Sequence, residues 1–294
     1  MEENQKNNIL DCVVIGAGPA GLSAAIYLKR ANVSFIVLEK ETPCSKLMKI
    51  TQLNNYAGFN GNGVDLAINM LKQVKSLGCE IGIEEVIDIN KKEYFILKTN
   101  KKEYWSRALI LATGFYSNIS PIKNVNKYLG KGVSTCVVCD AYFYKNKSVG
   151  YITSGENWKE EILYLSKIVK NVYVFKAPDK LSQFDENVIF INDENIIEVQ
   201  GNETVENLLT DKNKYKIDCL FINEINTQNN LYFEKLNLDR NGIFIKTDKE
   251  LITNVKGVFV AGDLVDRKLK QISVAVGDGA IAASNVISYL QNEK

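Results

Sequence analysis

Residues 9–40 are the segment that most narrowly limits how this 294-residue chain can fold. An apolar run at 9–15 leads into the motif G-A-G-P-A-G at 16–21. Apolar residues then recur at helical spacing, and a second apolar run ends at Glu39. Strand, glycine-rich turn, helix, strand and acid in this order are typical of the βαβ unit that binds a dinucleotide. The pattern therefore predicts an α/β fold built on a parallel sheet.

Each position in this unit has a physical task. Gly16 allows the tight turn, Gly18 lets the backbone approach a diphosphate, and Gly21 lets the helix pack closely on the strand. The free N–H groups and the dipole at the helix N-terminus favour phosphate there. Glu39 lies about 20 residues past the glycines, where a carboxylate can hold unphosphorylated ribose hydroxyls. The alternative, a chance glycine-rich turn, leaves the helix, the second strand and the acid unexplained.

A second candidate segment lies near the C-terminus. The run V-K-G-V-F-V-A-G-D-L-V-D at 255–266 is an apolar strand that leads into Gly262 and Asp263. This pair suits a close backbone approach beside one carboxylate acceptor, and a helix rich in small residues follows. The alternative interpretation is an ordinary final strand and helix.

The sequence C-V-V-C-D at 136–140 is a candidate redox centre. Cys136 and Cys139 in a C-x-x-C motif can form a small disulfide ring, and Asp140 can give or accept a proton or cap the helix. Half of a zinc site is one alternative, but the chain has no histidine and no second C-x-x-C. A pair of buried structural thiols is the other. We expect a redox dithiol and no metal.

The composition excludes several other functions. The absence of histidine removes Ser-His and Cys-His catalysis, and a net charge of +1 gives no reason to expect nucleic acid as a partner. Six cysteines in a chain without a signal-like segment are no disulfide framework. No apolar run looks long enough for a membrane span. We therefore expect a cytoplasmic protein of two domains.

These motifs together resemble the low-molecular-weight thioredoxin reductases, which are flavoproteins of the pyridine nucleotide-disulfide oxidoreductase class. The matching stretches are GAGPAGLSAA, LATG, CVVCDAYFY, VFVAGD and KQISVAVGDGAIAA. The resemblance implies two Rossmann-like, three-layer ββα-type nucleotide-binding domains, the second inserted into the first. The FAD-binding domain would comprise residues 1–115 and 245–294. The inserted, NAD(P)H-like domain would comprise residues 116–244 and carry the C-x-x-C.

The resemblance also implies the roles of single residues. Cys139 would face the flavin, Cys136 would be its disulfide partner, and Asp140 would be the acid. The protein would be a homodimer. The residues implied to bind FAD are Gly16, Ala17, Gly18, Pro19, Ala20, Gly21, Glu39, Lys40, Lys46, Leu47, Asn55, Val86, Ala112, Thr113, Gly114, Gly262, Asp263, Lys270, Gln271 and Ile272.

One departure from the family lies in the flavin loop. Where relatives have G-G-Q, this chain has Cys44-Ser45-Lys46. Lys46 either places a cation near the flavin, which would favour the reduced anionic form, or is a solvated loop lysine. Cys44 is either a third redox thiol or a replacement for a small residue.

A second departure lies in the inserted domain, in the run ITSGENWKEE. Thr153 stands in place of the first glycine of the fingerprint, Gly155 alone remains, and Trp158 replaces the small third residue. Lys176-Ala177-Pro178 stands where relatives have arginines for a 2′-phosphate. A bulky indole leaves no room for a diphosphate, and one lysine is a poor substitute for an arginine pair. We therefore expect that NADPH does not bind.

The resemblance then narrows to the NADPH-independent, ferredoxin-dependent flavin thioredoxin reductases. Electrons would pass from ferredoxin through FAD and the dithiol to a thioredoxin-like protein. Exposed lysines at 145, 147, 268 and 270 would offer an acidic ferredoxin a landing site, or are ordinary solvated charges. The alternatives are an enzyme with a second flavin in the vacated cleft, stacked on Trp158 or a tyrosine, an NADPH-dependent reductase with a degenerate site, an oxygen-dependent dithiol oxidase, and a flavin-binding sensor.

Overall fold

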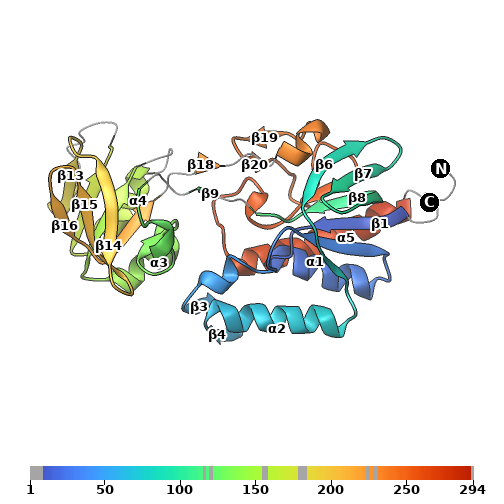
Figure 1. Ribbon diagram of the computed structural model, residues 1–294, viewed down its shortest axis with the longest axis horizontal. Helices are drawn as coiled ribbons and strands as arrows, with labels where there is room; N and C mark the ends of the chain where they lie inside the picture. Colours follow the sequence, from blue (N-terminus) through green and yellow to red (C-terminus); the bar gives the residue numbers. More distant parts are fainter. Residues whose placement is uncertain are drawn as a thin grey trace. The chain divides into compact units, whose positions relative to one another are not determined.

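The structure is a computed structural model that describes residues 9–114, 117–118, 122–153, 158–177, 184–222, 226–227 and 231–292. The chain divides into two compact units, the first formed by Met1–Tyr116 and Asn229–Lys294 and the second by Ser117–Gln228 (Figure 1). Both are α/β units, and the second is inserted into the first, which confirms the predicted fold class. The sequence-based boundary at 244/245 differs from the structural one because Phe233 and Leu236 pack in the core of the first unit.

The first unit is built on a seven-stranded sheet of order β5-β2-β1-β8-β7-β6, with β21 beside β8. Strands β1, β2, β5 and β21 belong to its parallel part, whereas β6 and β7 pair antiparallel. Strand β8 belongs to both parts, because it pairs with β1 along Trp105–Leu111, with β7 along Glu103–Ser106 and with β21 along Leu109–Leu111. The strands are β1 (Ile9–Ile15), β2 (Phe35–Glu39), β5 (Ile81–Ile83), β6 (Val86–Lys91), β7 (Phe95–Thr99), β8 (Glu103–Leu111) and β21 (Val258–Val260).

Helices α1 (Pro19–Arg30) and α5 (Ile272–Asn292) lie side by side against the sheet, and α2 (Gly63–Ser76) lies beside them (Figure 1). The small residues expected in α5 permit this close approach. A Cβ added to Gly279 would lie 2.0 Å from the carbonyl oxygen of Ala20. Ser23 Oγ of α1 also donates to the carbonyl of Val276 at 2.7 Å.

Helix α5 is long and apolar enough, by length and composition alone, to cross a membrane. The expectation that no apolar run reaches such a length is therefore wrong for this helix. Its contacts give its composition another explanation, because the face that carries Gly279 and Ala282 packs inside the first unit. One such helix is weak evidence for a membrane span.

Short elements connect these parts of the first unit. They are the hairpin of β3 (Leu53–Tyr56) and β4 (Phe59–Gly61), the pair β19 (Arg240–Asn241) and β20 (Phe244–Ile245), and the 3₁₀ turns η2 (Leu47–Lys49), η5 (Leu231–Leu236) and η6 (Gly262–Leu264).

The second unit has a five-stranded parallel sheet of order β10-β17-β11-β12-β13 and a three-stranded antiparallel sheet of order β14-β15-β16. Buried side chains between its layers form two apolar clusters. The strands are β10 (Val133–Ser134), β11 (Ser148–Ile152), β12 (Asn171–Phe175), β13 (Val188–Ile191), β14 (Ile196–Gly201), β15 (Val205–Thr210), β16 (Lys214–Lys216) and β17 (Cys219–Ile222). The pair β9 (Ser117–Asn118) and β18 (Asn226–Thr227), the helices α3 (Val137–Asp140) and α4 (Trp158–Ser166), and the 3₁₀ turns η3 (Asn126–Tyr128) and η4 (Ala141–Tyr144) complete it.

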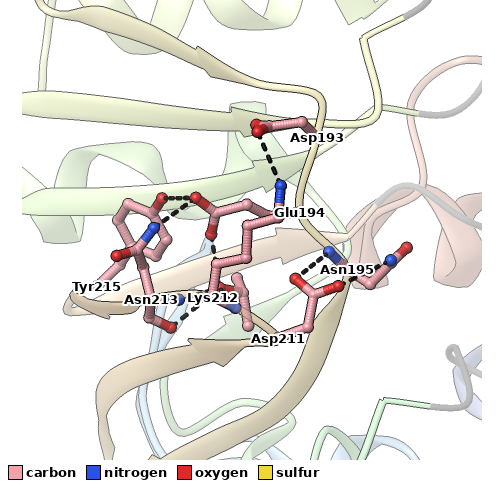
Figure 2. Close-up of polar contacts among 8 residues, drawn as sticks. Asp193, Glu194, Asn195, Asp211, Lys212, Asn213 and Tyr215 are labelled. Carbon is pink, nitrogen blue, oxygen red and sulfur yellow. Dashed lines mark hydrogen bonds and ion pairs between the residues drawn. The ribbon is translucent and has the colours of Figure 1, made fainter.

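A glutamate fastens the antiparallel strands of the second unit. Glu194 precedes β14 and accepts hydrogen bonds from Thr210 Oγ1 at 2.5 Å, from Tyr215 Oη at 2.8 Å and from Asn213 Nδ2 at 2.7 Å (Figure 2). Thr210 Oγ1 in turn lies 3.0 Å from the carbonyl oxygen of Asn213 and closes the turn between β15 and β16.

The first unit contains the same arrangement at the equivalent turn. Glu84 precedes β6 and accepts from Thr99 Oγ1 at 2.7 Å and from Tyr104 Oη at 2.8 Å. Thr99 Oγ1 lies 2.9 Å from the carbonyl oxygen of Lys102. The two units therefore share this detail of their antiparallel strands. We call each set of glutamate, threonine and tyrosine a hairpin clasp.

Candidate functional site

The glycine turn between β1 and α1 leaves its backbone accessible. Gly16 has φ +106°, and a Cβ added there would lie 2.5 Å from the carbonyl oxygen of Ala112. A Cβ on Gly21 would lie 1.8 Å from the carbonyl oxygen of Gly16, so helix and turn are in close contact. Gly18 caps α1, and a Cβ added there would meet no atom within 4 Å. The open side of the turn thus faces the helix N-terminus, where a diphosphate binds best.

Glu39 ends β2 and returns to this turn. Its Oε2 accepts a hydrogen bond from the N–H of Ala17 at 2.8 Å, and its Oε1 accepts one from the N–H of Glu41 at 3.2 Å. The carboxylate therefore lies at the edge of the glycine turn, as the predicted ribose contact requires. Lys40, the next residue, forms an exposed ion pair with Glu85 at 2.8 Å.

Cys44 is held against the same turn. Its N–H and its Sγ both lie within hydrogen-bonding distance of the carbonyl oxygen of Ala17, at 3.1 and 3.4 Å. Burial, together with the carboxylate of Glu39, raises the pKa of the Cys44 thiol to about 12. A thiol that stays protonated is a poor nucleophile, so this geometry favours the packing role over a third redox thiol.

The segment after β8 and the segment after β21 meet the glycine turn from the other side. Ala112 donates its N–H to the carbonyl of Ile15, and Ala261 donates to Leu111. Gly262 has φ +77°, and an added Cβ would lie 3.0 Å from the Cβ of Ala20. The predicted residues at 16–21, 112–114 and 262–263 are therefore brought together.

Lys46 and Asp263 converge on Gly114. A Cβ added to Gly114, which has φ +61°, would lie 3.6 Å from Lys46 Nζ and 3.8 Å from Asp263 Cβ. Desolvation by the surrounding protein lowers the pKa of the Lys46 ammonium, and the charge of Asp263 partly offsets this. Burial raises the pKa of the Asp263 carboxyl against the influence of Lys46 and Lys270. The Lys46 side chain is still exposed over much of its surface, and its ammonium lies beside Gly114 at the rim of the candidate site.

Lys270 has a different position from the one expected for an exposed landing lysine. Its Nζ donates to the carbonyl oxygens of Asp263 and Val265 and lies 4.1 Å from the centre of the Phe244 ring. Burial lowers the pKa of its ammonium to about 8. Lys270 therefore fastens the turn that carries Asp263.

The remaining predicted FAD residues lie around this centre. Asn55 Nδ2 donates to Gln271 Oε1 at 3.1 Å, which brings β3 to the start of α5. Leu47 is buried in η2, and Val86 is buried at the first position of β6. Thr113 donates its hydroxyl to the carbonyl of Gly114 at 3.1 Å. Their contacts with a cofactor stay predictions.

Sequence reasoning missed a buried ion pair behind this centre. Asp278 of α5 is 3% exposed, accepts from the N–H of Gly262 at 3.1 Å and pairs with Arg267 Nη1 at 2.6 Å. The signal in the sequence is a single charged residue inside the small-residue run SVAVGDGAIAA. It also missed Tyr232 of η5, whose buried hydroxyl has no hydrogen-bond partner among the described residues. The Tyr232 ring packs edge-on against Phe233 with ring centroids 4.9 Å apart.

The redox motif lies in the second unit, where β10 ends and α3 begins. Cys136 is disulfide-bonded, whereas Cys12, Cys44, Cys79 and Cys219 are free thiols. The side chain of Cys139 lies outside those described, so its pairing with Cys136 stays a prediction. Asp140 donates its N–H to the carbonyl of Cys136 at 3.2 Å, which places the predicted acid on the same short turn as the disulfide.

Residues 10–279 match the family described as Pyridine nucleotide-disulphide oxidoreductase. The thioredoxin reductase of Bacillus subtilis (strain 168) is 34% identical over 306 residues, and the match covers 97% of this chain and 96% of that protein. The chain belongs to the pyridine nucleotide-disulphide oxidoreductase family. This confirms the family resemblance and identifies the chain as an FAD-dependent disulfide oxidoreductase.

Two solved structures from the same family resemble this oxidoreductase over most of its length. Thioredoxin reductase from Streptococcus pyogenes MGAS5005 is 29% identical with a TM-score of 0.89, and covers 97% of this chain and 99% of its own. A ferredoxin-flavin thioredoxin reductase from Clostridium acetobutylicum is 30% identical with a TM-score of 0.56, and covers the same shares.

The residues of the first unit fit the FAD that this family implies. The turn at Gly18 has open space at a helix N-terminus, which suits the diphosphate. Glu39 lies at the edge of the turn, where it would hold ribose hydroxyls, and the buried Tyr232 hydroxyl beside Thr113 would offer a further polar contact. When bound, FAD supplies the two-electron redox chemistry. The residues that would hold the cofactor are those of the glycine turn and Glu39, with Lys46 and Asp263 near Gly114.

The described residues that flank the corresponding turn of the second unit are buried and make contacts within that unit. Thr153, at the end of β11, is buried, and its hydroxyl donates to the carbonyl oxygens of Phe175 and Lys176 after β12. Trp158 opens α4, is 6% exposed, and stacks on Phe184 with centroids 6.3 Å apart and an interplanar angle of 28°. Gly155 and Pro178 lie outside the described residues. Among those described, no group of three or more metal-ligand side chains could hold a metal ion.

Proposed function

We propose that this oxidoreductase reduces the disulfide of a thioredoxin-like protein through FAD and the Cys136/Cys139 dithiol, with reduced ferredoxin as the electron donor and without NADPH. The observation that carries the proposal is the packing of Trp158 and Thr153 at the turn where a pyridine nucleotide would bind. We further propose a cytoplasmic homodimer, in keeping with the family resemblance.

The packing of these two side chains supports the absence of NADPH. A dinucleotide needs small residues at this turn so that its diphosphate can approach the backbone and the helix N-terminus. Here the Thr153 hydroxyl is bonded to the ends of the neighbouring strand, and the Trp158 indole is packed in the core of the unit. Lys176 has φ +59° and is one cation in place of an arginine pair.

The printed names of the relatives support the substrate and the donor. The Bacillus subtilis relative is named thioredoxin reductase, and the Clostridium acetobutylicum structure is named ferredoxin-flavin thioredoxin reductase. In the exchange, a thiolate of the enzyme attacks the target disulfide to form a mixed disulfide, and the second thiolate then displaces the reduced target. Two electrons and two protons pass from the dithiol to the target.

An anaerobic donor comparison tests the proposal. The purified FAD enzyme is mixed with NADPH, NADH or chemically reduced ferredoxin, and loss of the flavin absorbance band is followed in a stopped-flow instrument. Ferredoxin should bleach the flavin within the turnover time, and neither nicotinamide should do so, while dithionite shows the full amplitude. Rapid bleaching by NADPH would overturn the donor assignment and leave the dithiol chemistry untouched.

The principal alternative is reduction of the flavin by NADPH, because the description of the family names a pyridine nucleotide. The same samples also test for a second flavin, an oxidase and a sensor. Two FAD per chain would indicate a second flavin, although Trp158 already stacks on Phe184. Fast peroxide formation from a small dithiol in air would indicate an oxidase. Biological activity that survives Cys136→Ser would indicate a sensor.

A further inference from the structure

We propose that Ser134 is a positioning residue of the redox centre. Its hydroxyl links the Asp140 carboxyl to the backbone of Cys136 and so orients that carboxyl toward the disulfide. The inference rests on the redox role of the cysteine pair in the proposed function. It does not depend on which molecule supplies the electrons.

The geometry around Ser134 forms a closed ring. Ser134 is 6% exposed at the end of β10, where its strand position pairs with Phe221 of β17. Its Oγ accepts the N–H of Cys136 at 3.0 Å and donates to Asp140 Oδ2 at 2.7 Å. The N–H of Asp140 closes the ring on the carbonyl of Cys136 at 3.2 Å. The serine proton has a second acceptor in that carbonyl at 3.3 Å, but Asp140 Oδ2 is nearer, at 2.7 Å.

The surroundings of Asp140 give this hydrogen bond a large effect. Burial raises the pKa of the Asp140 carboxyl, and the hydrogen bond from Ser134 lowers it. The titratable groups near it are Tyr144 on η4 and Cys219 on β17, and burial raises the pKa of both. These two groups are neutral at physiological pH, so they add no charge beside the carboxyl. The more distant Asp218 and Lys147 have opposite charges and act on Cys219.

The chemistry explains why a carboxyl in this place needs a fixed orientation. When an external thiolate attacks the disulfide, a new S–S bond forms to the attacked sulfur and the other sulfur leaves as a thiolate. The proton of Asp140 then moves to that thiolate and leaves a carboxylate, which accepts the Ser134 hydrogen bond more strongly. The reverse transfer accompanies disulfide formation. Ser134 therefore holds the proton donor in place and stabilises its ionised product.

The test compares Ser134→Ala with a matched control elsewhere in the same unit. Ser166 is also buried, and its Oγ also donates to an aspartate, Asp185 Oδ2, at 2.7 Å. Both alanine variants thus lose a part-buried hydrogen bond from a buried serine to an aspartate, but only one loses it at the redox centre. Ser134→Thr, which keeps a hydroxyl, is the rescue variant.

The rate at which dithiothreitol reduces the Cys136 disulfide is measured in each variant between about pH 5 and pH 9, with acid quenching and thiol counting. Ser134→Ala should be about tenfold slower at neutral pH because the acid is no longer aimed. Its pH profile, divided by that of Ser166→Ala, should shift to higher pH, because the hydrogen bond that lowers the pKa of Asp140 is gone. Ser134→Thr should restore the profile.

A Ser134→Ala profile that matches the Ser166→Ala profile would overturn the inference. If Ser134→Ala fails to fold, as judged by circular dichroism and flavin content, the Ser134→Thr variant tests the inference. A shifted pH profile in that variant, which retains the hydroxyl, would overturn the inference. Asp140→Asn provides the reference. If that variant leaves the profile unchanged, the acid role that the family resemblance implies for Asp140 fails. If Asp140→Asn changes the pH profile and Ser134→Ala does not, only the role of Ser134 fails.

Discussion

The turns after β1 and after β11 follow the same order of elements and differ in what fills them. After β1, glycines leave the backbone bare, with open space at Gly18 and close packing of Gly21 on the carbonyl of Gly16. After β11, Thr153 closes the turn with its hydroxyl, and Trp158 begins the helix with a buried indole. The first turn has open space beside a helix N-terminus, whereas the described residues that flank the second turn make contacts within their own unit.

The hairpin clasps show that the difference between the two units is confined to particular regions. Glu194 accepts hydrogen bonds from a threonine and a tyrosine in the second unit (Figure 2), and Glu84 does so at nearly equal distances in the first. Both threonines also close the following turn. Where a contact stabilises the hairpin, the two units are alike. At the nucleotide turn the described residues of the two units differ, with glycines in the first unit and Thr153 and Trp158 in the second. The comparison therefore separates features of the scaffold from features of the binding site.

The largest expected effect comes from closing the first turn. In Gly21→Ala the added Cβ would overlap the carbonyl oxygen of Gly16, only 1.8 Å away, so helix α1 must move away from the turn. We expect purified protein without bound FAD and with a destabilised first unit. The ratio of flavin to protein absorbance and a thermal melt measure both effects. A variant that retains stoichiometric flavin would show that the turn does not need this close packing.

Two further glycines separate cofactor binding from folding. Gly18→Ala adds a methyl group to open space at φ −80°, so the unliganded fold should be unchanged while FAD binds at least about tenfold more weakly, because the methyl occupies diphosphate space. Gly277→Ala, also in open space but inside α5, should leave FAD affinity unchanged and stabilise the helix by about 0.5–1 kcal/mol.

The next prediction tests whether Trp158 merely blocks a pyridine-nucleotide site after β11 or whether the residues that would bind the nucleotide are absent. Trp158→Ala removes a buried indole from the core of the second unit and should cost about 3–5 kcal/mol of unfolding free energy, measured in urea by circular dichroism. Combined with Thr153→Gly, it should still give no flavin reduction by NADPH, because Lys176 offers no bidentate clamp. Phe190→Ala, from the same apolar cluster but another element, controls for stability alone. NADPH-dependent bleaching in the double variant would show a blocked but intact site.

The sequence was sufficient to predict the glycine turn between β1 and α1, but it was insufficient to predict the tertiary contacts around that turn. Glycines at fixed spacing between apolar runs determine local backbone geometry, so β1, α1 and the position of Glu39 were predictable, as was the fold class. The clasp of Glu84, Thr99 and Tyr104 joins residues from three elements, and no local pattern marks it. The inward turn of Lys270 and the orphaned Tyr232 hydroxyl depend likewise on tertiary packing.

A smaller effect is expected from the charge at the flavin loop. Lys46→Gln introduces the residue that relatives have there and removes an ammonium that lies near Gly114 and Asp263. The FAD midpoint potential should fall by about 30 mV or more, equivalent to about 1.4 kcal/mol for two electrons, because the reduced anionic flavin loses a neighbouring cation. Spectroelectrochemical titration measures it. Lys49→Gln, an exposed lysine of the same 3₁₀ turn, should shift the potential much less, and equal shifts would contradict a specific role for Lys46.

The smallest expected effect concerns the hairpin clasps and tests whether their hydrogen bonds stabilise the fold. Around Glu194, burial acts to raise the pKa of the carboxyl, but the hydrogen bonds from Thr210, Tyr215 and Asn213 outweigh it and lower that pKa below 4.5. A depressed folded pKa contributes stability above the unfolded value that is lost as pH falls through the folded one. The thermal midpoint of the second unit should therefore fall less steeply below about pH 4.5 in Glu194→Gln than in the wild type. Asp193→Asn removes an exposed partner of Lys212, which also lowers the pKa of Asp193, and should change that slope much less because water screens this single ion pair. If Asp193→Asn flattens the acid limb as much as Glu194→Gln does, the stabilisation belongs to the surface charges of this turn, and the likeness of the two clasps carries no energetic meaning.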